Sequence, residues 1–208
     1  GLERHPSVFS TLNIASAQHT DLLYPFVRAF GIRIDRDLEV MRTDQTPSDV
    51  CARVLSSLDP ILADERPELI LVQGDTTTTL AGTLAGFHRR IPVGHVEAGL
   101  RTGDVSSPFP EEMNRRLVGR LASIHFAATE HNRSTLLAEG VADEDIVVTG
   151  NPVVDAVNSI LDRTPRDSVF DRVTAATDIV APVMPSIGRS SCSPFASRAS
   201  ANWSVKKG

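Results

Sequence analysis

Apolar residues along the chain follow two spacings: short continuous runs, and longer stretches in which they recur every three or four residues. The first spacing is typical of buried strands and the second of helices with one apolar face. Strands are predicted at residues 11–17, 69–72, 93–96, 124–128 and 146–148, and helices at 20–30, 47–66, 77–88, 111–121, 132–139 and 153–161.

The run Leu69–Val72 is apolar at every position, which favours a parallel strand covered on both faces. Strands and helices that alternate with short connections form βαβ units, whose strands run parallel in one sheet. The sequence therefore predicts an α/β fold with a Rossmann-like, doubly wound parallel sheet between about residues 9 and 161.

The periodic pattern ends near Pro165, and residues 187–204 mix Ser, Arg and Ala without a strand or helix period. We therefore assign residues 1–164 to one N-terminal domain and residues 165–208 to an irregular tail. The first residues, Gly1–Pro6, contain neither an initiator Met nor an apolar signal segment. We expect an upstream segment to be missing.

The composition is that of an ordinary globular protein, with 41% hydrophobic and 23% charged residues among 208. A net charge of −5 argues against nucleic acid as a partner, because there is no basic surplus to neutralise phosphates. No apolar stretch approaches the roughly 20 residues that span a bilayer, so we expect a cytoplasmic protein without a membrane segment. Cys51 and Cys192 are too few and too far apart for a disulfide framework or a paired-cysteine metal site, and we interpret them as free thiols.

Candidate chemistry is expected just after the strands, because ligands of an open parallel sheet bind beyond the carboxyl ends of its strands. Asp75 and the four threonines Thr76–Thr79 follow the predicted strand at 69–72 and open a helix. Two interpretations are open: an N-cap with a buried first turn, or a carboxylate and backbone N–H groups directed at a ligand. Four consecutive threonines are poor helix formers, which favours a role beyond capping.

Glu97 ends an otherwise apolar strand, and a carboxylate buried there needs a partner or a proton. The alternative to a catalytic role is an ion pair with Arg101 or Arg115. His95 shares the face of Glu97 if the strand is regular, because side chains alternate with a period of two. A satisfied core histidine is its other interpretation.

Glu111 and Glu112 open a helix behind the segment Pro108–Pro110. Acids in a first turn complement the helix dipole, which explains at least one of them. Together with Asp75 and Glu97 they also predict a carboxylate cluster, in which like charges raise at least one pKa toward neutrality. Such a cluster suits general acid and base catalysis.

Four segments, in this order, resemble the bacterial non-hydrolysing UDP-N-acetylglucosamine 2-epimerases. They are Gly74–Thr79, Ile91–Gly103, Ser107–Arg115 and Thr149–Ala156, and Ser16–His19 matches an earlier family segment. The resemblance runs from about Asn13 to Asp162. It implies one half of a glycosyltransferase-B-like fold, in which two Rossmann-like domains face each other across a cleft.

The resemblance implies interconversion of UDP-GlcNAc and UDP-ManNAc by elimination and re-addition of UDP, without a metal or a nicotinamide cofactor. It implies that Asp75, Glu97 and Glu111 are catalytic: Asp75 and Glu97 transfer protons around C2 of the sugar, and Glu111 supports the cleft and is a third candidate for proton exchange. Residues expected to contact the substrate are His95, Arg101, Arg115 and Asn151. The intact protein is expected to be a homodimer.

Gln18 and Glu111 match an allosteric UDP-GlcNAc site of bacterial members, but Asp21 and Asp44 stand where a Gln and an Arg are common. The family's opening strand and Gly-Thr-Arg-Pro-Glu-type loop have no match in residues 1–12, and its second domain has none in residues 164–208. We therefore expect the chain alone to be inactive. The alternatives are a glycosyltransferase of similar fold and a non-catalytic binding domain.

Overall fold

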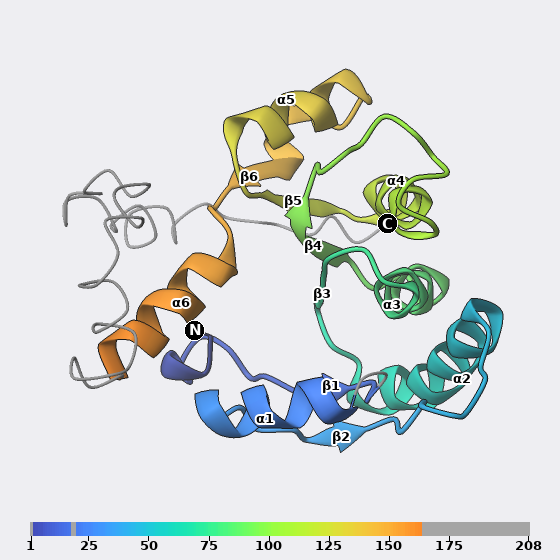
Figure 1. Cartoon of the computed structure of the whole chain (residues 1–208), viewed down its shortest axis with the longest axis vertical. Helices are drawn as coiled ribbons and strands as arrows, with labels where there is room; N and C mark the ends of the chain where they lie inside the picture. The colour runs from blue at the N-terminus through green and yellow to red at the C-terminus, as the bar shows by residue number, and fades with distance from the viewer. Residues whose placement is uncertain (1, 18–19, 164–208) are drawn as a thin grey trace, which may run out of the picture. The chain divides into compact units, whose positions relative to one another are not determined.

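A computed structural model describes residues 2–17 and 20–163 of the chain (Figure 1). The chain divides into two units, the first up to Ala156 and the second from Val157, and the helices and strands up to Val148 belong to the first. The helices are η1 (Leu2–Arg4), α1 (Thr20–Phe30), α2 (Pro47–Glu65), α3 (Thr77–His88), α4 (Glu111–Leu121), α5 (Glu130–Ala138), η2 (Asp143–Asp145) and α6 (Pro152–Arg163). The strands are β1 (Ile14–Ala15), β2 (Arg36–Asp37), β3 (Ile70–Gln73), β4 (Val93–Ala98), β5 (Ile124–Ala127) and β6 (Ile146–Val148).

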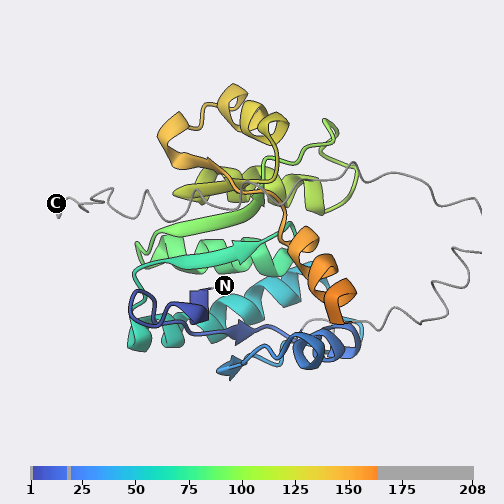
Figure 2. The same cartoon turned by 90° about the vertical axis from the view of Figure 1, so that its left-hand side faces the viewer.

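The first unit is built on a four-stranded parallel sheet in the order β3-β4-β5-β6. Figure 2 shows the sheet from the side, with β3 and β4 running in the same direction. β1 and β2 form a separate parallel pair. The predicted α/β, Rossmann-like architecture is confirmed. The expected strand at residues 11–17 is shorter than predicted, and the polar strand β2 was not predicted because it carries no apolar run.

Helices α3 and α4 pack against each other and against β3 and β4, while α5 packs against β5 and β6. Helix α2 packs on α3 rather than on the sheet. A buried cluster between α2 and α3 consists of Val40, Val50, Val54 and Ala81, and a second one beneath α5 consists of Ala98, Ala127, Leu136 and Ile146. The sheet and its helices therefore form a scaffold on which the strand-end residues are held.

The helix starts follow local capping rules. Thr46 and Asp49 form a capping box at the start of α2, as the Thr46-Pro47 pair predicts. Thr76 caps α3 by accepting a hydrogen bond from the Thr79 N–H, and the Thr79 hydroxyl donates to the Gln73 carbonyl at 2.8 Å. Two of the four threonines are thus explained by capping and by the tie to β3.

Several predictions fall on residues that the structure does not describe: the irregular tail at 165–208, Gln18 and Cys192. Cys51, which is described, is a free and partly buried thiol. Among residues 2–17 and 20–163, none of the helices combines the length and the hydrophobicity that crossing a membrane requires.

Candidate functional site

The carboxyl ends of the parallel strands carry the predicted site residues. Asp75 comes two residues after β3, Glu97 is the penultimate residue of β4, and Asn151 follows β6. Glu111 is the first residue of α4. Because the four strands of the sheet are parallel, these positions lie together at the carboxyl ends of the strands, as expected. This end of the sheet is called the sheet edge below.

Asp75 is held by helix α4. Its Oδ2 accepts hydrogen bonds from Nε of Arg115 at 2.9 Å and from Nη2 at 2.6 Å. Its backbone carbonyl accepts a third from the Asn114 side-chain amide at 2.8 Å. The Asp75 side chain is nevertheless 28% exposed, so a ligand at this edge could reach the carboxylate.

Glu97 has a different partner. The side-chain amide of Asn151 donates to its Oε1 at 2.9 Å, across 54 residues of sequence. Arg101 and Arg115 instead bind other carboxylates, so the suggested ion pair of Glu97 with either of them is wrong. A Cβ atom on Gly74 would lie 3.9 Å from the second oxygen, Oε2, which places Glu97 beside the turn that carries Asp75.

The backbone of β4 is irregular at Glu97. The strand register shifts between Val96 and Ala98, and Glu97 has a φ of +69°, in the left-handed region. A non-glycine residue there is under strain of about 1 kcal/mol or more, and bulges of this kind re-aim side chains next to active sites. The regular alternation that would place His95 and Glu97 on one face therefore does not hold.

His95 is a buried core histidine, with 1% of its surface exposed. Its Nε2 lies 2.8 Å from the Gly74 carbonyl, one residue before Asp75. Burial lowers the pKa of His95, so the ring is neutral near pH 7 and Nε2 carries the proton donated to that carbonyl. Through this bond His95 supports the turn of Asp75, and its contact with substrate stays a prediction.

His125 pairs with His95 in register on the neighbouring strand β5 and is equally buried. Burial lowers the pKa of His125 to about 4, with repulsion from the charged form of His95 and from Arg101 as lesser causes. The Nδ1 atoms of both rings are buried and have no hydrogen-bond partner among the described residues. Protonation of either ring in the folded chain would therefore lower the free energy of unfolding.

This burial predicts acid sensitivity. Between pH 6.5 and 4 the unfolded state protonates His125 and the folded state does not, so the free energy of unfolding falls as the pH falls. The contribution of His125 to the free energy of unfolding is complete above pH 6.5. About 2 kcal/mol of this contribution is lost between pH 7 and pH 5. Urea unfolding at pH 7 and at pH 5 measures how much stability is lost between them. This loss should be smaller in His125→Gln than in the native chain, by the contribution of the missing histidine. An equal loss in the variant and the native chain would contradict the prediction.

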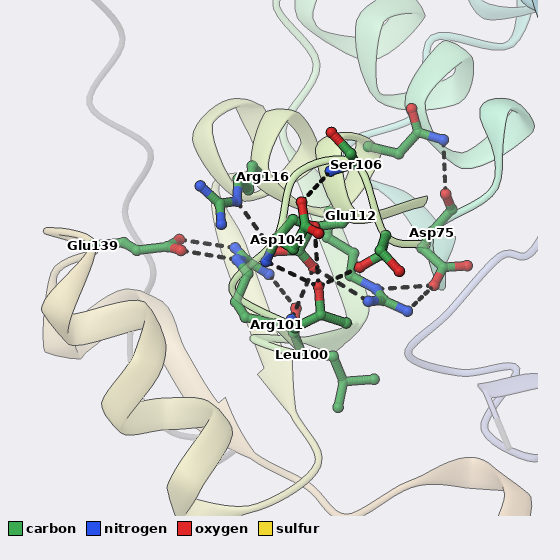
Figure 3. Close-up of polar contacts among 12 residues, drawn as sticks. Asp75, Leu100, Arg101, Asp104, Ser106, Glu112, Arg116 and Glu139 are labelled. Carbon is green, nitrogen blue, oxygen red and sulfur yellow. Dashed lines mark hydrogen bonds and ion pairs between the residues drawn. The ribbon is translucent and has the colours of Figure 1, made fainter. Parts of the chain in front are cut away.

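Arg101 pairs with Glu139, not with Glu97. Its guanidinium binds both carboxylate oxygens of Glu139 at 2.8 Å, and its side chain is 9% exposed (Figure 3). This ion pair fastens the segment after β4 to the end of α5. A contact of Arg101 with substrate stays a prediction.

Glu112 was predicted as a member of the carboxylate cluster but was given no role of its own, and it is the most buried of these carboxylates. Its carboxylate accepts hydrogen bonds from the guanidinium groups of Arg115 and Arg116 and from the Thr102 N–H. A sequence signal for these contacts exists, because Arg115 and Arg116 follow Glu112 at the i+3 and i+4 spacing of helical ion pairs. That spacing does not reveal that Arg115 also reaches Asp75.

The arrangement supplies two carboxylates with separate partners at one sheet edge. Asp75 is neutralised by a guanidinium, whereas Glu97 is held by a neutral amide. Glu111, partly buried, opens the helix whose next turn supplies Arg115. Carboxylates in different surroundings can divide proton removal and proton return between them.

A protein-family model described as UDP-N-acetylglucosamine 2-epimerase matches residues 2–181. The UDP-N-acetylglucosamine 2-epimerase of Yersinia pestis is 52% identical over 155 residues, 74% of this chain and 41% of the relative. That of Escherichia coli K12 is 52% identical over 148 residues, 71% of this chain and 39% of the relative. The chain thus spans about two fifths of the length of these curated relatives.

Solved structures of the same family also match this chain over less than half of their own length. The structure of UDP-GlcNAc 2-epimerase from Neisseria meningitidis bound to UDP-GlcNAc matches with a TM-score of 0.74 and 39% identity, over 84% of this chain and 48% of that one. The Methanocaldococcus jannaschii enzyme in complex with UDP-GlcNAc and UDP matches with a TM-score of 0.64 and 32% identity, over 75% of this chain and 42% of that one.

Proposed function

Because the chain belongs to the UDP-N-acetylglucosamine 2-epimerase family, we propose that it supplies the proton-transfer side of an epimerase acting on UDP-GlcNAc and UDP-ManNAc. The observation that carries the proposal is the placement of Asp75 and Glu97 at one sheet edge with separate partners. For the complete protein we propose a cytoplasmic homodimer, on the family resemblance alone.

The proposed reaction has two halves. One carboxylate removes the C2 proton as the C1–O bond to UDP breaks, which leaves a 2-acetamidoglucal and free UDP. UDP then adds back to C1, and a second carboxylate returns a proton to the opposite face of C2. Asp75 and Glu97 are the proposed proton-transfer groups, and Glu111 is proposed to support the site.

Breaking the C1–O bond develops negative charge on the diphosphate, which cationic side chains must stabilise. At this edge Arg115 is already paired with Asp75 and Glu112, and Arg101 with Glu139. We therefore propose that the diphosphate is bound mainly by residues outside this chain, in the part of the relatives that it does not cover.

The test uses two proteins, the 208-residue chain and a hybrid in which residues 13–156 replace the matching segment of the Escherichia coli relative. Each is incubated with UDP-GlcNAc in deuterated water and followed by NMR. We expect the hybrid to form UDP-ManNAc with deuterium at C2, and the chain alone to form none.

Two results would contradict these expectations. Product from the chain alone would show that the uncovered part is dispensable. A folded hybrid that binds UDP-GlcNAc but leaves the C2 hydrogen unexchanged would reject the epimerase assignment. Transfer of the sugar with C2 untouched would support a glycosyltransferase instead.

A further inference from the structure

The carboxylate of Glu112 is fully buried, with 0% of its side chain exposed. Its Oε2 accepts a hydrogen bond from the Thr102 N–H at 3.1 Å and lies 3.3 Å from Nη1 of Arg115. Its Oε1 accepts from Nε of Arg116 at 3.1 Å. Burial by itself raises the pKa of Glu112, but the Thr102 N–H and the two guanidinium groups outweigh it, and the pKa is lowered. Glu112 is therefore a buried anion whose charge is fully paired.

Arg115 is shared between this buried anion and the site. It presents Nη1 to Glu112, and Nε and Nη2 to Asp75. The Arg115 side chain is 16% exposed, so it lies between the buried carboxylate on one side and the accessible one on the other. Figure 3 shows Glu112 and Asp75 in this cluster, with the segment of Leu100, Arg101 and Asp104 beside Glu112.

An ordinary helical ion pair would involve only residues of α4. Glu112 also accepts from the Thr102 N–H, in the segment after β4. Through Arg115 it is linked to Asp75, in the turn after β3. A single buried charge thus joins three chain segments that meet at the proposed site. Groups of this kind keep a functional side chain in one orientation.

We propose that Glu112 is a positioning residue for Asp75, which acts by fixing Arg115 from its buried side. Asp75 then binds a guanidinium whose place is already determined, and its carboxylate keeps one orientation at the sheet edge. The importance of Asp75 rests on the proposed function, but the positioning itself is a property of the 208-residue chain and is measurable without catalysis.

The test is NMR of the arginine and aspartate side chains in the full chain. In the native chain we expect a slowly exchanging Nε–Hε signal for Arg115 and hindered rotation of its guanidinium. In Glu112→Gln we expect loss of that signal and a shift of the Asp75 Cγ resonance toward its position in Arg115→Gln. The matched control is Glu139→Gln, which removes a carboxylate from Arg101 and should leave the Arg115 and Asp75 signals in place. Unchanged signals in a folded Glu112→Gln chain would overturn the proposal.

A second variant decides the matter if Glu112→Gln does not fold. Asp75→Asn changes a partly exposed side chain, so the fold should tolerate it. We expect the Arg115 guanidinium to remain restricted in this variant, because Glu112 still holds Nη1. Free rotation of Arg115 in Asp75→Asn would show that Asp75 positions the arginine, and the proposal would fail. If the hybrid lacks epimerase activity while Arg115 behaves as expected, only the proposed function fails.

Discussion

Glu97→Gln in the hybrid protein should lower the rate of epimerisation at least about 100-fold, because loss of a general acid or base typically costs a factor of 10² to 10⁴. The amide keeps the shape of the side chain but cannot accept a proton from carbon. Asn151 donates to Oε1 in the native chain, and the glutamine carbonyl oxygen can take over that acceptor position. The bulged backbone should therefore persist, and the loss should appear in kcat more than in KM.

The measurement is the initial rate of UDP-ManNAc formation by NMR, with deuterium entry at C2 as a second readout. Asp59→Asn is the matched control, because Asp59 on α2 forms an exposed ion pair with Arg89, which follows α3 at the end of that helix opposite to Asp75. That control should keep the native rate. A Glu97→Gln hybrid within tenfold of the native rate would remove Glu97 from the proton-transfer groups.

Gly99→Ala should destabilise the fold by about 2 to 4 kcal/mol. Gly99 follows β4 with a φ of +87°, and a Cβ there would lie 2.4 Å from the Asn132 carbonyl oxygen and 2.9 Å from its carbon. Both are backbone atoms of the first turn of α5, where Thr129 caps the helix, so they cannot move aside cheaply. The left-handed conformation adds about 1 kcal/mol for any residue with a side chain, and overpacking adds about 1 to 3.

Gly103→Ala separates these two terms. Gly103 has the same φ of +87°, but a Cβ there would meet nothing within 4 Å. Its substitution should therefore cost only the conformational term, about 1 kcal/mol. Urea unfolding of both variants measures the difference, which gives the cost of the clash with α5. Equal unfolding midpoints for the two variants would show that α5 shifts freely and that the close approach at Gly99 is unimportant.

Much of the architecture was predictable from local pattern. The apolar run Leu69–Val72 predicts the parallel strand β3, but its expected burial on both faces is wrong, because residues along β3 alternate between partly buried and exposed and Leu71 is 45% exposed. The apolar face of α2 predicts its packing on a neighbouring element. The position of Asp75 and Glu97 at a common edge follows from the same pattern. Parallel strands bring their carboxyl ends together wherever the chain between them leads.

The pairing of charges was decided by the tertiary structure alone. Arg115 lies 40 residues from Asp75 in the sequence and 18 from Glu97, and it binds Asp75. Glu97 takes its partner, Asn151, from 54 residues away, and its bulged backbone breaks the alternation that the apolar pattern implies. The physical reason is the distance along the chain over which each signal acts. Hydrophobic periodicity is a local pattern, and it indicates only which face of one element is buried. A hydrogen bond forms only when the fold brings two side-chain atoms from distant segments within about 3 Å of each other.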